Sequence, residues 1–244
     1  MNNISILGSG WLGFPLAQVL SEEFSVKLST STNEKIDRLR GENITPFIVD
    51  TTNLNDEVDK FLCSDILIIN IPSKNIDGFK ELIKHILNSN IKKIVFISSI
   101  SVLKDETSLL LEIERLFKNT NLKITILRFA GLIGYGRNPA KFFPKGKAVK
   151  DANAPVNMIH RDDCINIIQE VINQDIFDET FNCSAPSHPT KKEFYTYCAE
   201  VSNLPIPTFD LEENSNPQKI VESNILISKL NYKFIHEDLM KIVF

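Results

Sequence analysis

The sequence predicts an α/β protein built on a doubly wound parallel sheet with helices on both faces, followed by a small C-terminal α/β lobe. Up to residue 136, apolar runs of strand length alternate with segments whose apolar residues recur at helical spacing. The first strand also runs into Gly8-Ser9-Gly10-Trp11-Leu12-Gly13 and then into a helix over Phe14–Leu20. Strand, Gly-x-Gly-x-x-Gly turn and helix together predict a Rossmann domain that binds a dinucleotide.

Each glycine of this turn has an expected role. Gly8 allows the tight turn, Gly10 lets the backbone approach a pyrophosphate, and Gly13 lets the helix pack closely against the strand. The helix N-terminus offers N–H groups and a positive dipole end to the anion. We therefore assign the turn to cofactor binding through Gly8, Ser9, Gly10, Trp11, Leu12 and Gly13.

The end of the second predicted strand bears on the choice of cofactor. An NAD site usually has an acid there that bonds the ribose hydroxyls, whereas this chain has Thr30, Ser31 and Thr32. No acid would repel a 2′-phosphate, and Lys35 or Arg38 could neutralise it. We expect NADP, with NAD as the alternative. The alternative, that Thr30, Ser31 and Thr32 only end the strand and cap the following helix and bind no cofactor, stays open.

Other polar or small residues follow later strands, where a parallel sheet meets its ligand. Strands are expected over Ile44–Val49, Asp65–Pro72, Ile91–Ile97 and Leu122–Arg128. The cofactor-binding residues expected at their carboxyl ends are Asp50, Thr51, Asn70, Ile71, Pro72, Ser98, Ala130 and Gly131, with Ser99 as the candidate catalytic residue.

Beyond the strand–helix alternation, the chain predicts a second part. We expect an NAD(P)-binding domain over residues 1–136 and a substrate-binding lobe over residues 137–244, interleaved with the Rossmann core rather than independent. Loops are expected over Ala130–Gly136, Asn138–Pro155 and Asp210–Gln218, and the lobe's main helices over Cys164–Ile172 and Lys191–Val201.

Composition excludes several classes of protein. The net charge of −4 and the absence of a basic stripe argue against nucleic acid as a partner. No apolar stretch approaches the roughly 18 residues of a membrane span, and no charged-then-apolar leader opens the chain. Cys63, Cys164, Cys183 and Cys198 are scattered, which predicts free thiols in a reducing cytoplasm. A monomer and a homodimer both stay open.

No metal site is expected, because neither His160 nor His188 has a suitably spaced partner. Asp162 and Asp163 are interpreted as N-terminal caps of the following helix. A basic run of Lys141, Lys145, Lys147 and Lys150 with Phe142 and Phe143 could line a site for a phosphate-bearing substrate, although a solvated loop is the more common meaning of such a run.

Several blocks in order resemble the extended and atypical short-chain dehydrogenase/reductases of the NAD-dependent epimerase/dehydratase type. The resemblance covers nearly the whole chain. Its blocks are Phe96–Val102, Ile126–Gly134, Val156–Asp163, Phe181–Pro186 and Ser228–Phe234. It implies an NAD(P)-dependent reaction on a small molecule such as a sugar nucleotide.

The catalytic pair of that family is missing. Its members use a Tyr and a Lys one helical turn apart, but here Glu106 and Leu110 stand at those places and no Y-x-x-x-K occurs. Leu7 also replaces the first glycine of the extended members' motif. Ser99 occupies the place of the catalytic Ser or Thr. Glu106 is more consistent with a solvated carboxylate than with an acid/base.

Three functions therefore stay open. The first is an epimerase or oxidoreductase acting on a sugar nucleotide or a related small molecule. The second is a non-catalytic NAD(P)-binding sensor or regulatory protein, which the missing Tyr–Lys pair favours. The third is a Rossmann dehydrogenase with an all-helical second domain, against which the serine block argues.

Overall fold

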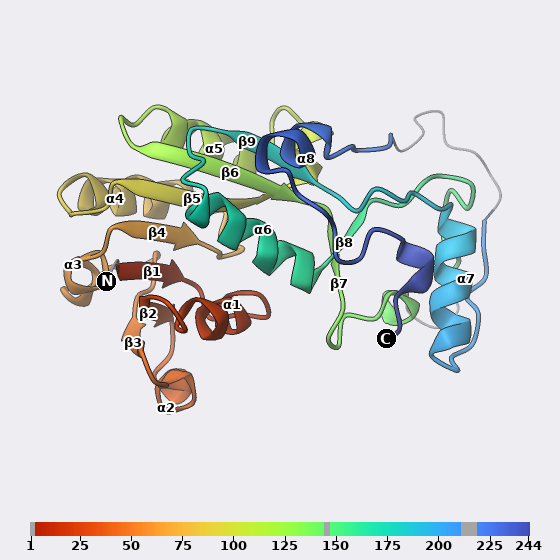
Figure 1. Ribbon diagram of the computed structural model, residues 1–244, viewed down its shortest axis with the longest axis horizontal. Coiled ribbons are helices and arrows are strands. Elements are labelled where there is room, and N and C mark those ends of the chain that lie inside the picture. The colour runs from red at the N-terminus through yellow and green to blue at the C-terminus, as the bar shows by residue number, and fades with distance from the viewer. Residues whose placement is uncertain (1–2, 144–146, 211–218) are drawn as a thin grey trace. The chain divides into compact units, whose positions relative to one another are not determined.

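The computed structural model describes residues 3–143, 147–210 and 219–244 and contains a seven-stranded sheet in the order β3-β2-β1-β4-β5-β6-β9 (Figure 1). Its strands are β1 (Asn3–Leu7), β2 (Ser25–Thr30), β3 (Ile44–Ile48), β4 (Ile66–Ile69), β5 (Lys93–Ser99), β6 (Lys123–Phe129) and β9 (Thr180–Cys183). The pairs β2–β3, β1–β2, β1–β4 and β4–β5 are parallel. The order reverses between β1 and β4, which is where a doubly wound sheet opens a crevice for its ligand.

The helices expected over Phe14–Leu20, Cys164–Ile172 and Lys191–Val201 are present, and their ends differ from the expected ones by at most three residues. The helices before β9 are α1 (Gly13–Leu20), η1 (Asn33–Lys35), α2 (Ile36–Leu39), α3 (Glu57–Phe61), α4 (Ile76–Leu87), η2 (Ile100–Leu103), α5 (Leu109–Lys118), η3 (Pro139–Lys141) and α6 (Arg161–Asn173). Later come α7 (Lys191–Val201), α8 (Asn224–Leu230) and η4 (Leu239–Lys241). None of the helices in the described part of the chain has the length and apolar character needed to cross a membrane.

The chain divides into two compact units that share three elements. The first unit contains residues 1–128 and 168–181, and the second contains residues 129–167 and 182–244. The boundaries therefore fall inside β6, before its last residue, and inside α6 and β9. The division expected at residue 136 stays a prediction.

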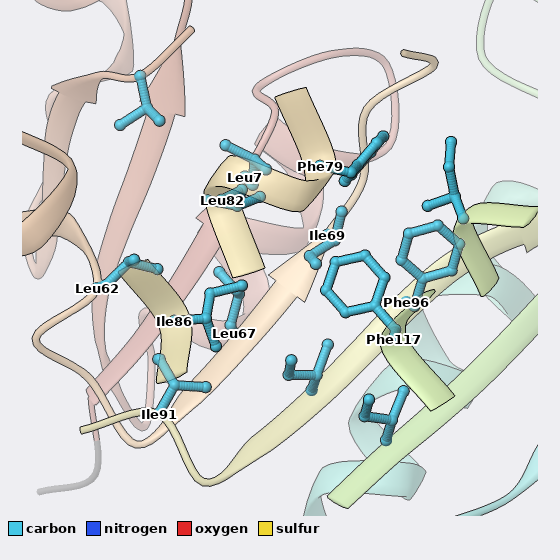
Figure 2. Close-up of a cluster of buried hydrophobic side chains, with 14 of the residues drawn as sticks. Leu7, Leu62, Leu67, Ile69, Phe79, Leu82, Ile86, Ile91, Phe96 and Phe117 are labelled. Carbon is cyan, nitrogen blue, oxygen red and sulfur yellow. The ribbon is translucent and has the colours of Figure 1, made fainter. Parts of the chain in front are cut away.

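An apolar core explains why the central strands form. Leu67 and Ile69 of β4 are almost fully buried against α4 and α5. Figure 2 shows the aromatic centre of this cluster, where Phe117 lies 5.9 Å from Phe79 and 5.2 Å from Phe96 between ring centroids. Strands buried on both faces are typical of parallel sheets covered by helices, so the continuous apolar runs form the centre of the sheet.

The second unit contains a short parallel pair of strands, β7 (Gly131–Ile133) and β8 (Met158–His160). The prediction of a loop over Ala130–Gly136 was therefore wrong for its first part. Gly131 pairs with Met158, and Ile133 is buried in the second unit's core with Phe194 of α7. Tertiary pairing outweighed the local turn signal of the glycines. The loop expected over Asp210–Gln218 lies, beyond Asp210, outside the described residues.

A buried ion pair joins β5, α5 and β6 of the first unit. The Glu114 carboxylate of α5 is 1% exposed and accepts bonds from Arg128 Nε at 3.0 Å and Nη2 at 2.5 Å. The Ser98 hydroxyl of β5 donates to the same carboxylate at 2.5 Å. The charge of Glu114 is thus paired and hydrogen-bonded, as burial requires.

We expect Glu114→Ala to lower the free energy of unfolding by about 3–5 kcal/mol, because it leaves the Arg128 side chain, which is only 15% exposed, without its partner. Glu112→Ala, which removes an exposed carboxylate from the same helix, should change it by less than about 0.5 kcal/mol. Urea unfolding of both variants measures the difference. Equal effects would mean that the buried pair has no special role.

Candidate functional site

The glycine turn after β1 packs against the end of β4, with no room for a side chain at Gly8 or Gly13. Gly8 has φ +106°, and a Cβ there would lie 2.4 Å from the carbonyl oxygen of Asn70. A Cβ on Gly13 would lie 1.9 Å from the carbonyl oxygen of Gly8. Both positions therefore require glycine for the backbone to close up. The Ser29 hydroxyl, at the end of β2, accepts a bond from the Gly8 N–H at 2.9 Å.

Gly10 differs from the other two glycines because it faces open space. A Cβ on Gly10 would meet nothing within 4 Å, and the residue is exposed. Helix α1 follows at once, with no side-chain cap from Leu12 and no acidic residue in its first turn. This arrangement leaves an uncrowded, electropositive helix end of the kind that binds an anion.

A cleft of about 420 Å³ lies beside this turn in the first unit. Ten of the predicted cofactor-binding residues line it: Gly8, Ser9, Gly10, Thr30, Ser31, Asp50, Thr51, Asn70, Ile71 and Pro72. The structure adds Leu7, Ser29, Lys35, Val49, Thr52 and Ser73. Of these six residues, only Lys35 is assigned to the site from the sequence, as a possible partner of a 2′-phosphate. The other five directly precede or follow a predicted site residue in the chain.

The remaining predicted residues lie outside the lining of this cleft. They are Trp11, Leu12, Gly13, Thr32, Ser98, Ser99, Ala130 and Gly131. Gly13 acts through packing, as described above. Ala130 and Gly131 belong to the second unit, where their N–H groups bond the carbonyl oxygens of Cys183 and Asn157.

The strand ends give the cleft its polar character. The Asp50 carboxylate accepts bonds from the Thr52 N–H at 2.9 Å and from the Thr52 hydroxyl at 2.8 Å, and these bonds lower the Asp50 pKa. Asp50 is therefore an ionised acceptor at neutral pH. Ser31 and Lys35 are exposed and line the cleft, whereas Arg38 does not.

The serines of the β5 block have different surroundings. Ser98 is buried and its hydroxyl donates to Glu114, so its side chain serves the ion pair described above. Ser99 is half-buried, and its hydroxyl accepts the Ser101 N–H at 3.1 Å, which leaves its proton available to a substrate oxygen. Glu106, in the segment before α5, is exposed.

The second unit has a pocket of its own of about 600 Å³. Its lining is Phe142, Phe143, Lys147, Ala148, Val149, Lys150, Lys191 and Tyr195. Burial raises the pKa of Tyr195 to about 12, so the phenol stays protonated. Of the predicted basic run, Lys147 and Lys150 line the pocket, Lys141 does not, and Lys145 lies outside the described residues.

The second unit also brings together polar residues that the sequence analysis treated separately. Asp163, interpreted as a helix cap, is fully buried and accepts the Ile235 N–H at 2.7 Å and the Tyr232 hydroxyl at 2.9 Å. Burial raises its pKa. His160 and Asp162 meet His236, which follows Asp162 by 74 residues. Local spacing could not reveal a partner so distant in the chain.

Comparison with known proteins shows a sequence similarity over nearly the whole chain. No protein-family model matches the chain. Protein YeeZ of Escherichia coli strain K12 is 29% identical to it, over 98% of this chain and 97% of YeeZ.

Solved structures of other proteins superpose on almost the whole length of this chain. A functionally unknown conserved protein from Silicibacter pomeroyi DSS has a TM-score of 0.78 at 15% identity and covers 98% of this chain and 96% of its own. UDP-glucuronic acid 4-epimerase from Bacillus cereus, solved with UDP-glucuronic acid and NAD, has a TM-score of 0.78 at 17% identity and covers 98% and 95%. The chain therefore has the Rossmann fold seen in these structures, as the sequence predicted.

Proposed function

We propose that the chain binds NAD(P) in the cleft beside Gly8–Gly13 and uses it on a sugar nucleotide or a related small molecule. The observation that carries the proposal is the cleft itself. The backbone at Gly10 has no side chain against it, and the first turn of α1 has no side-chain cap. Both follow β1, at the point where the strand order of the sheet reverses. A pyrophosphate fits this position because it needs N–H donors and no side chain in its way.

The cleft also suits the adenosine half of the cofactor. The Asp50 carboxylate can accept a bond from an adenine amino group, and Val49 and Ile71 supply apolar contact. Bacillus cereus UDP-glucuronic acid 4-epimerase, of like fold, was solved with NAD.

We predict that Gly10→Asp weakens cofactor binding by about 100-fold or more, because its carboxylate would face the pyrophosphate. Folding should be unaffected, since nothing lies within 4 Å of a Cβ at this position. Calorimetric titration with NADP and NAD measures the affinity, and a thermal melt checks the fold. Gly41→Asp, which adds the same charge at an exposed glycine outside the cleft, is the control. Unchanged affinity in folded Gly10→Asp would overturn the site.

We propose NADP as the preferred cofactor. Thr30 and Ser31 stand where an NAD site has an acid, and the Lys35 ammonium can pair with a 2′-phosphate. The NAD in the Bacillus cereus epimerase makes NAD the alternative.

The preference predicts that Lys35→Ala weakens NADP binding by about tenfold and leaves NAD binding unchanged, because only NADP has the phosphate that Lys35 would neutralise. Arg38→Ala, which removes an exposed cation outside the cleft, should change neither. Parallel titrations of the three proteins decide the matter. Tighter binding of NAD than of NADP to the wild type would contradict the preference.

The second unit's pocket supports a sugar nucleotide as the substrate. Lys147 and Lys150 offer charge to a diphosphate, and Phe143 and Tyr195 offer aromatic faces, with ring centroids 4.8 Å apart. Lys191 is already held by the Lys150 carbonyl oxygen at 3.0 Å and by Asp151 at 3.5 Å, which makes it a fixed wall of the pocket.

Catalysis would depend on fewer groups than in the resembled family. The four tyrosines of the chain are Tyr135, Tyr195, Tyr197 and Tyr232, so none precedes residue 135. A bound nicotinamide supplies the hydride acceptor or donor. Ser99 can donate its hydroxyl proton to a substrate oxygen as negative charge develops there.

The missing Tyr–Lys pair supports a second candidate function, a non-catalytic NAD(P)-binding sensor. Glu106 at the Tyr place is exposed, and the Leu110 side chain has no proton to exchange. A positioned acid/base contributes about 10²–10⁴-fold to a rate, so its loss is a substantial handicap for an enzyme.

If the protein is an enzyme, Ser99→Ala should lower kcat by about 10²-fold, because the developing charge loses its donor. Glu106→Gln should leave kcat within about threefold, since an exposed carboxylate contributes little to a remote proton transfer. Turnover is measured with UDP-sugars, aldehydes and ketones. A large loss in Glu106→Gln with none in Ser99→Ala would reverse the assignment. Tight cofactor binding without turnover would favour the sensor.

A further inference from the structure

We propose that His160, Asp162 and His236 form a binding site for a divalent transition-metal ion, with Zn²⁺ the best match to the donor set. The site lies wholly within the second unit. The proposal does not depend on the dinucleotide function.

The three donor atoms converge as ligands of one ion would. Asp162 Oδ2 lies 3.2 Å from His160 Nδ1 and 3.1 Å from His236 Nε2. All three atoms lie within 4.8 Å of one another. Two imidazole nitrogens and one carboxylate oxygen are a recurrent ligand set for zinc and for non-haem iron. Donors about 2.1 Å from a tetrahedral ion stand about 3.4 Å apart, close to the separations seen here.

The ligands are held in place independently of any ion. His160 ends strand β8, and Asp162 belongs to the first turn of α6. His236 is fixed through its backbone, because the buried Asp163 carboxylate accepts the N–H groups of Ile235 at 2.7 Å and His236 at 3.1 Å. Such supporting bonds orient metal ligands and lower the cost of assembling them.

The hydrogen bonding of His160 leaves a place for a cation. The Asp162 N–H lies 3.3 Å from His160 Nδ1, which is longer than an ordinary hydrogen bond to this nitrogen. The Asp162 carboxylate oxygen, an acceptor, lies 3.2 Å from the same nitrogen. A metal ion between them can take the single lone pair of Nδ1 in place of the long contact with the N–H, and it can bind the carboxylate oxygen and the His236 nitrogen as well.

The surroundings permit a water as the fourth ligand. The His160 side chain is 7% exposed, whereas those of Asp162 and His236 are 31% and 27% exposed. One side of the set is thus closed and the other reaches solvent, as in zinc sites with an open position. The Tyr135 hydroxyl lies 3.2 Å from Asp162 Oδ2 and can orient the carboxylate. The Arg161 guanidinium lies over the Tyr135 ring, 3.8 Å from its centroid, and its positive charge opposes that of the ion.

The proposal is tested with ZnCl₂ and CoCl₂ on the full chain after treatment with EDTA. We expect one equivalent of either ion to bind the wild type, and Co²⁺ to give the visible absorption of a tetrahedral site. His236→Gln and Asp162→Asn should each weaken binding by at least about tenfold. Zn²⁺ should raise the melting temperature of the wild type and leave those of the two variants unchanged.

Two controls exclude other ligands. His188→Gln changes a histidine of the same unit whose Nδ1 contacts the Val156 carbonyl oxygen, and Cys63→Ser removes the exposed thiol. Both should bind the ion as the wild type does. Circular dichroism of the EDTA-treated variants verifies that they are folded. The proposal would be overturned if the wild type bound no ion, or if His236→Gln and Asp162→Asn bound it as tightly as the wild type does. The three side chains would then be held together by hydrogen bonds alone.

Discussion

The close approach of backbone at Gly8, Gly13 and Asn70 constrains the whole first unit. Because no Cβ fits at the two glycines, α1 starts directly against the carbonyl oxygen of Gly8, and the turn lies on the end of β4. Larger residues would push the helix off the sheet and close the cleft. The same packing places Gly10 in open space, so one constraint both joins helix to sheet and exposes a helix N-terminus to an anion.

The polar side chains at the carboxyl ends of the strands are of two kinds: some form hydrogen bonds within the protein, and others remain available to a ligand. The Ser29 hydroxyl accepts the Gly8 N–H and the Ser98 hydroxyl donates to the Glu114 carboxylate, so both side chains hold the protein's own structure in place. Asp50 and Ser99 keep an acceptor or a proton for a ligand. Residues only one position apart therefore have different functions, because successive side chains of a strand point to opposite faces.

The second unit relies on contacts between residues far apart in the chain. Asp163 holds Tyr232, Ile235 and His236 through one carboxylate, whose burial is tolerated because each oxygen is bonded. Its neighbour Asp162 faces His160 and His236. Adjacent acids on one helical turn thus serve structure and a candidate ion site.

The sequence by itself determined the fold class, the glycine turn and most residues that line the cleft beside it, because these depend on local patterns. Apolar runs of strand length, helical spacing and glycine at Gly8, Gly10 and Gly13 are all properties of neighbouring residues. Only the tertiary structure decided that Gly131–Ile133 pairs as a strand, that Ser98 bonds Glu114, and that His236 meets Asp162. Their partners lie 16 or more residues away in the chain, and packing energy that no local pattern encodes selects them.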